Sequence, residues 1–131
     1  MDLKSVLKYI RTYILRLGMS GDCIFCKIAN KDIKSSIVYE DDNIIAFDDI
    51  NPQAPVHVLV VPKKHISNIM ELSDYGVLEG VFRGIQKVAE LKNIDKEGFR
   101  VVVNHLQKGG QTVFHLHFHV LGGRQMMWPP G

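Results

Sequence analysis

The strongest constraint on the fold of this 131-residue chain is a row of three histidines near its C-terminal end. His115, His117 and His119 alternate with apolar residues up to Leu121. Alternation with a period of two predicts a half-buried β-strand whose successive side chains point to opposite faces. The three imidazoles are therefore expected on one face, opposite Leu116, Phe118 and Val120. A histidine-striped solvent face is the alternative interpretation, but three histidines in register are hard to explain by packing.

The spacing of the row limits the chemistry that it can perform. Positions i and i+2 of a strand lie about 6.8 Å apart, so His115 and His119 are expected about 13 Å apart. One metal ion holds imidazole nitrogens at about 2 Å, and a single zinc bound by all three histidines is therefore disfavoured. Separate roles fit better, because an imidazole can be a nucleophile, can donate or accept a proton, or can donate to phosphate oxygens.

The rest of the chain predicts an α+β fold with an antiparallel sheet. Strands are expected over residues 38–40, 44–48, 56–61, 100–104 and 114–121, and short turns join most of them. One helix is expected to begin at Ser73 as its N-cap. Its predicted buried stripe is Val77, Leu78, Val81, Phe82, Ile85, Val88 and Ala89. Glycines at positions 76, 80 and 84 of this helix either permit close approach of another backbone or are tolerated at the surface.

Two parts of the chain are expected, a helical extension over residues 1–21 and a single domain over residues 22–131. Residues 3–17 have the spacing of an amphipathic helix. Residues 1–19 carry a net charge of +3, which leaves −1 for the remainder of a chain whose total is +2. A near-neutral domain argues against a nucleic-acid partner, and no apolar run is long enough for a membrane span. Met19-Ser20-Gly21 offers a second start site.

The cysteine count excludes a disulfide framework, because the chain has only Cys23 and Cys26. A reducing compartment, the cytoplasm, is therefore expected, with organelle targeting by residues 1–19 as the alternative. Cys-x-x-Cys together with distant histidines is a zinc-binding pattern. Two buried free thiols are the alternative interpretation. A redox pair is less favoured, since nothing in the chain resembles a thioredoxin unit.

A glycine-containing turn, Gly109-Gly110-Gln111-Thr112, directly precedes the histidine row. It lacks the lysine and the following helix of a P-loop. Glycine turns can nevertheless point backbone N–H groups at an anion, and Thr112 adds a hydroxyl. Beside three histidines, this turn is a candidate phosphate cradle.

The segment His115-Leu116-His117-Phe118-His119-Val120-Leu121 resembles the histidine triad motif, and the chain from about Asp22 to Gly131 resembles the Hint branch of that superfamily. Three other segments carry the resemblance: Asp49-Ile50-Asn51-Pro52-Gln53-Ala54-Pro55, Pro62-Lys63-Lys64-His65-Ile66-Ser67, and the tail from Gly122-Gly123-Arg124-Gln125 through Trp128-Pro129-Pro130-Gly131. The tail distinguishes this branch from dinucleoside polyphosphate hydrolases and uridylyltransferases. The resemblance implies a five-stranded antiparallel sheet that becomes continuous across a homodimer.

The resemblance also implies roles for individual residues. His117 corresponds to the nucleophile, His119 to a phosphate contact near the leaving group, and His57 to a fourth active-site histidine. Asn104, Gly110 and Thr112 correspond to phosphate-side contacts, and many relatives have serine where this chain has Thr112. Asp49 corresponds to the carboxylate that binds the ribose hydroxyls. The implied nucleotide pocket also includes Phe25, Ile28, Phe47, Ile50 and Trp128. In metal-bearing relatives, the positions of Cys23, Cys26, His65 and His115 hold zinc.

The implied activity is hydrolysis of purine nucleoside phosphoramidates, including AMP–amine adducts, through a nucleotidyl-histidine intermediate. No cofactor is expected for this chemistry, and any zinc is expected to be structural. Dinucleoside polyphosphate hydrolysis is the alternative enzyme activity. A nucleotide-binding regulator with incidental turnover is the alternative of another class.

Overall fold

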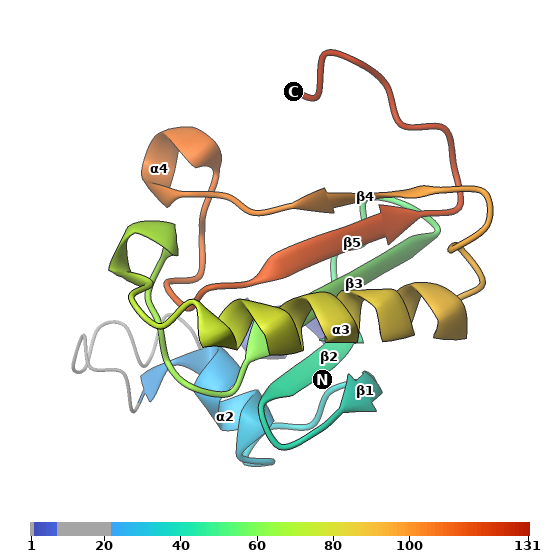
Figure 1. Ribbon diagram of the computed structural model, residues 1–131. Helices are drawn as coiled ribbons and strands as arrows, with labels where there is room; N and C mark the ends of the chain where they lie inside the picture. The colour runs from blue at the N-terminus through green and yellow to red at the C-terminus, as the bar shows by residue number, and fades with distance from the viewer. Residues whose placement is uncertain (1, 8–21) are drawn as a thin grey trace.

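The computed structural model describes residues 2–7 and 22–131 and has the predicted α+β architecture (Figure 1). Residues 3–7, which are the first part of the amphipathic helix predicted over 3–17, are helical. The remainder of that predicted helix lies outside the described residues. Within the described ranges, no helix is long and apolar enough to cross a bilayer.

One antiparallel sheet of five strands forms the centre of the domain, as predicted. Its strand order is β1-β2-β3-β5-β4, and every neighbouring pair is antiparallel. The strands are β1 (Ile37–Glu40), β2 (Ile44–Asp48), β3 (Val56–Pro62), β4 (Phe99–Val102) and β5 (Phe118–Gly122). The histidine-bearing strand β5 therefore lies between β3 and β4, where it has a hydrogen-bonded partner on both sides.

Two of the helices lie on opposite faces of the sheet. The helical elements are α2 (Ile24–Ala29), the short 3-10 helix η2 (Ile69–Glu71), α3 (Gly76–Leu91) and α4 (Leu106–Gly109). Figure 1 shows α3 running along one face, with α2 near the other. The predicted N-cap, Ser73, is wrong: α3 begins at Gly76, and its first turn is preceded by Asp74, whose carboxylate accepts from the Gly76 N–H at 3.0 Å.

Alternation along the central strands separates two apolar cores. Ile44, Ala46, Val58 and Val60 face α3, together with Leu116, Phe118 and Val120. Ile45, Phe47, Leu59 and Val61 face α2 and pack on Ile24, Phe25 and Ile28. Phe82, which was expected in the buried stripe of α3, is instead 52% exposed. Both faces of β2 and β3 are thus covered, and the rings of His115 and His117, just before β5, pack against Phe25 of α2.

The predicted strand over residues 114–121 is only partly correct. Regular pairing begins at Phe118, and residues 113–115 form a bend. The Leu116 N–H donates to the Ile66 carbonyl instead of to a neighbouring strand. The side-chain alternation nevertheless continues through the bend. The expected half-buried character is wrong, because His115 is 0% exposed and His117 is 7% exposed.

Gly84 is the position where α3 approaches the sheet most closely. A Cβ atom at Gly84 would lie 2.6 Å from Ile44 Cδ1, whereas a Cβ at Gly80 would meet Ile44 Cγ2 at an ordinary 3.7 Å. The glycine spacing therefore reflects close packing at Gly84 in particular. An added methyl group there must displace a fully buried side chain.

We expect opposite effects from alanine at these two glycines. Gly84→Ala should lower the free energy of unfolding by about 1 kcal/mol or more, because overpacking outweighs the gain in helix propensity. Gly80→Ala is the matched control and should raise it by about 0.5–1 kcal/mol. Urea unfolding of the two variants measures both effects. Equal stabilisation by the two alanines would contradict the packing described for Gly84.

Candidate active site and metal site

His117, His119 and α2 border a cavity of about 750 Å³, a size that is common for small-molecule sites. One part of its wall is polar and includes Asp49, His57, Thr112, His117 and His119. The remainder is mainly apolar, and it includes the predicted base-pocket residues Phe25, Ile28, Phe47 and Ile50. The structure therefore brings nine of the predicted site residues to one cavity.

The tautomer of His117 is set by a backbone carbonyl. Its Nδ1 lies 2.7 Å from the carbonyl oxygen of His115, which can only accept, so Nδ1 must be the donor. Nε2 then carries a lone pair. The Phe25 ring stands edge-on to the imidazole, with the ring centroids 5.1 Å apart. This arrangement holds an unprotonated nitrogen in a residue that lines the cavity.

A second chain of hydrogen bonds sets the tautomers of His57 and His119. The backbone N–H of Gln53 donates to His57 Nδ1 at 3.0 Å, so the proton of a neutral His57 is on Nε2. This Nε2–H donates to His119 Nδ1 at 2.9 Å. His119 consequently carries its own proton on Nε2, which is buried and has no partner among the described residues. That orphaned donor is available to a ligand in the cavity.

The Asp49 carboxylate borders the same cluster. Its Oδ1 accepts from the Asn51 N–H at 2.8 Å, while Oδ2 lies 3.4 Å from His57 Nε2. Burial lowers the pKa of His57 and of His117 despite this nearby negative charge. Burial also lowers the pKa of His119 to about 4, and His117 and His57 contribute to that shift. All three imidazoles are therefore neutral at physiological pH, as the hydrogen-bond chains require.

These lowered pKa values predict that the protein loses stability in acid. In the unfolded chain a histidine binds its proton near pH 6.5, whereas folded His119 does so only near pH 4. The unfolded state therefore holds more protons between these values, and stability falls as the pH falls from 6.5 toward 4. Each such histidine contributes a slope of at most about 1.4 kcal/mol per pH unit. Urea midpoints measured from pH 8 to 5 test this, and His119→Gln should reduce the slope. A pH-independent midpoint would contradict it.

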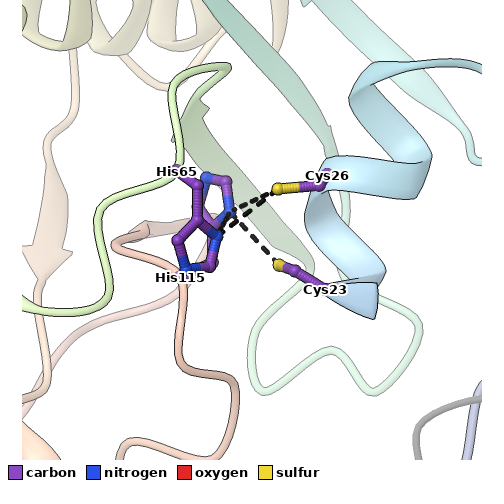
Figure 2. Close-up of side chains that lie close together, drawn as sticks. All are labelled: Cys23, Cys26, His65 and His115. Carbon is purple, nitrogen blue, oxygen red and sulfur yellow. Dashed lines mark hydrogen bonds between the residues drawn. The ribbon is translucent and has the colours of Figure 1, made fainter. Parts of the chain in front are cut away.

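A separate cluster lies at the other end of the histidine row (Figure 2). Cys23 precedes α2 and Cys26 lies in its first turn, so the i, i+3 spacing brings both thiols to one side of the helix. His65 comes from the loop after β3 and His115 from the bend before β5. The four ligand atoms lie within 4.8 Å of one another. Figure 2 shows the four side chains converging from three segments.

The distances in this cluster fit a tetrahedral zinc ion. Zinc bonds of about 2.3 Å to sulfur and about 2.0–2.1 Å to nitrogen imply N···N edges near 3.3 Å and N···S edges near 3.6 Å. The Nδ1 atoms of His65 and His115 are 3.2 Å apart, and His115 Nδ1 lies 3.2 Å from Cys23 Sγ. Cys26 Sγ lies 3.4 Å and 3.5 Å from the two nitrogens.

The environment of His115 also suits a ligand. Its Nε2 lies 2.7 Å from the Pro62 carbonyl oxygen, so Nε2 donates and the Nδ1 lone pair faces the thiols. Burial raises the pKa of the Cys26 thiol to about 12, with a further contribution from Cys23. A cation is therefore needed to hold the thiolate form at neutral pH.

Three predicted nucleotide contacts do not line the cavity: Asn104, Gly110 and Trp128. Trp128 is 81% exposed in the C-terminal tail, where Arg100 lies over its ring. The turn predicted to bind an anion has two of its backbone N–H groups bonded within the protein. The Gly110 N–H donates to the Gln107 carbonyl, and the Gln111 N–H to that of Leu106. Thr112 is the residue of this turn that lines the cavity.

Sequence reasoning missed two residues that organise the site. Gln111 is buried; its amide donates to the carbonyls of Ser67 and Val113 and accepts from the Leu106 N–H. It thereby ties α4 to the loop that carries His65. The Gln53 backbone sets the tautomer of His57. Neither role leaves a sequence signal, because each depends on a contact between loops.

A five-stranded sheet that presents a histidine row to a small-molecule cavity defines a histidine triad protein. The chain belongs to the HIT domain family, whose sequence pattern matches residues 30–126. It is 47% identical to a HIT-like protein of Synechococcus elongatus over 115 residues, which are 86% of this chain and all of the relative. It is 44% identical to a 14 kDa zinc-binding protein of Brassica juncea over 114 residues, which are 84% of this chain and all of that protein.

Solved structures give the same family. A HIT family hydrolase of Legionella pneumophila is 48% identical, with a TM-score of 0.81 over 83% of this chain and 99% of that one. A histidine triad protein of Clostridium difficile is 47% identical, with a TM-score of 0.80 over 83% and 96% of the two chains.

Proposed function

We propose that this protein is a nucleoside phosphoramidate hydrolase that cleaves the P–N bond of AMP–amine adducts through a nucleotidyl intermediate on His117. The observation that carries the proposal is the pair of fixed tautomers. His117 offers a bare Nε2, and His119 offers an Nε2–H, with ring centroids 5.0 Å apart. A nucleophile beside a hydrogen-bond donor suits attack on a phosphoryl group. The Legionella pneumophila relative, which is named a hydrolase, supports the reaction class.

In the first step, the His117 Nε2 lone pair forms a bond to phosphorus and the P–N bond breaks. The electron pair of that bond stays on the leaving nitrogen, which takes a proton from water and departs as the amine. The His119 Nε2–H donates to a phosphoryl oxygen as charge develops there. The lowered pKa of His119 suits this role, because a neutral imidazole keeps a fixed donor over the physiological pH range.

In the second step, a water molecule attacks phosphorus and the bond to His117 Nε2 breaks. The electron pair returns to the imidazole, the water releases a proton to solvent, and the nucleoside monophosphate leaves. The His115 carbonyl favours both steps, because it accepts from Nδ1–H and so stabilises positive charge on the His117 ring. Asp49 is the group that we assign to the ribose hydroxyls, since its carboxylate lines the same cavity and lies 3.4 Å from His57 Nε2.

Dinucleoside polyphosphate hydrolysis, the alternative activity, breaks a different bond. A nucleotide-binding regulator, the other alternative, does not depend on turnover. Steady-state kinetics with adenosine 5′-phosphoramidate and with diadenosine polyphosphates distinguish the two enzyme activities. We expect a higher kcat/KM for the phosphoramidate by about two orders of magnitude or more. A preference for the polyphosphates would overturn the proposal.

A regulatory role is tested in cells. If the protein acts as a regulator, cells that carry a catalytically inactive variant should behave like cells that carry the intact chain.

We also propose that Cys23, Cys26, His65 and His115 hold a structural zinc ion. Their geometry supports it, as does the relative that is named a zinc-binding protein. Zinc bound there would tie α2 to the loops that carry His65 and His115. Four protein ligands complete a tetrahedral shell, so the ion would stabilise the site without contacting substrate.

We further propose that the chain forms a two-fold dimer through β4. This strand is at the edge of the sheet, and Phe99 and Val101 on it are each 36% exposed. Unpaired edges with exposed apolar residues favour pairing with a second copy. Trp128 would then be positioned near the partner's site. Sedimentation at micromolar concentration should give a dimer, and a monomer would contradict this arrangement.

A further inference from the structure

The cavity is lined by more than the HIT domain. Residues 2–7, which we call the N-terminal segment, contribute Leu3, Val6 and Leu7 to its wall. The HIT domain match begins at residue 30, so this part of the wall lies outside the family's domain. The segment lies on the α2 face of the sheet, because Val6 packs against the apolar cluster on that face.

The segment contacts the apolar end of the cavity. Val6 packs against the cluster that contains Phe25, Ile28 and Phe47, which form the predicted base pocket. The catalytic histidines contribute to the polar part of the same cavity. A nucleotide whose phosphate lies at His117 would therefore direct its base toward the N-terminal segment.

Leu3 and Leu7 are suited to contact a ligand. They are four residues apart in a helical turn, so their side chains share one face. Leu3 is 43% exposed and Leu7 is 54% exposed, although both line the cavity. The turn is held by Asp2, whose carboxylate accepts from the Ser5 N–H at 2.7 Å. Apolar surface that is still exposed beside a pocket gains free energy when a flat, apolar ligand group covers it.

We infer that Leu3 and Leu7 form an additional wall of the nucleobase pocket and make the protein selective for ligands that carry a base. This inference rests on the proposed function, because it requires a nucleoside in the cavity. The segment is a wall and not a plug, since about 750 Å³ remains open beside it. The base then gains contacts that a ligand without a base cannot make.

The test compares AMP with ribose 5-phosphate by titration calorimetry on the full chain. The variant Leu3→Gln/Leu7→Gln removes apolar surface without adding charge, and Ser5→Gln changes the same segment at a residue that does not line the cavity. We expect the Kd for AMP to rise about tenfold in the double variant, with little change for ribose 5-phosphate. Ser5→Gln should leave both values unchanged. For phosphoramidate turnover, KM should rise while kcat holds.

Every other outcome of this test would overturn the inference. Tighter AMP binding by the double variant would identify the segment as an obstacle and overturn the inference. Unchanged AMP binding, or equal weakening for the two ligands, would overturn it as well while leaving the proposed function intact. Failure of the unmodified protein to bind AMP would overturn the proposed function and the inference together.

Discussion

His117→Ala is expected to reduce turnover by at least about 10³-fold while nucleotide binding is retained. The substitution removes the attacking Nε2 atom, whereas His57, His119 and Asp49 still line the cavity. Residual catalysis would then depend on positioning and electrostatics alone. Steady-state kinetics measure the loss, and calorimetry with AMP measures the retained binding.

The intermediate provides a second readout for the same variant. Acid-quenched mass spectrometry of the intact protein with excess substrate should detect a nucleotidyl adduct, which His117→Ala should lack. His119→Ala is the comparison, and it should lose less activity because it supplies a hydrogen bond and not a covalent bond. His105→Ala, outside the cavity, should retain both adduct and turnover. Robust turnover by His117→Ala, or an adduct on His57, would overturn the mechanism.

Zinc removal is expected to cause the largest loss of stability. Protein purified without chelator should contain about one zinc per chain. Cys23→Ser/Cys26→Ser should reduce this below about a tenth of an equivalent and lower the free energy of unfolding by about 4 kcal/mol. The expected decrease in Tm exceeds about 10 °C. The reason is that the ion would replace weak contacts of thiols with imidazoles by metal bonds that tie α2 to the segments carrying His65 and His115.

Chelation distinguishes the effect of zinc from the effect of the substitutions. EDTA should lower the Tm of the unmodified chain to near that of the double serine variant and should not change the variant further. His105→Asn, a histidine outside the cluster, should keep its zinc. Zinc below about a tenth of an equivalent in the unmodified chain would rule out a structural tetrahedral site. The two partly buried thiols would then be explained by packing alone.

The α+β fold and the sheet were predictable because their signals are local. Apolar runs bounded by turn residues placed β2 over 44–48 and placed β3 within one residue of its observed end. The predicted alternation of the histidine row is also present, since Leu116, Phe118 and Val120 lie on the α3 side of the sheet. Period-two alternation depends only on backbone geometry, so it could be read without knowing the neighbours.

The limits of regular structure were less predictable. Ser73 had the features of an N-cap, but α3 begins three residues later, and Phe82 lies at the edge of the buried stripe. The strand over 114–121 was shortened to Phe118–Gly122 because the Leu116 N–H bonds to the loop that carries His65. Such contacts between segments distant in sequence override local propensity.

The sequence by itself determined which residue types were available: a histidine row, a Cys-x-x-Cys pair, and a family resemblance that named their partners. The resemblance had also implied how the histidines divide, but only the tertiary structure supplied the geometry of that division. His115 turns its Nδ1 toward the thiols, whereas His117 and His119 line the cavity. Tautomers were also beyond the sequence, since the donors and acceptors that set them are the backbone groups of Pro62, His115 and Gln53. Backbone groups are the same at nearly every position, and their direction exists only once the chain has folded.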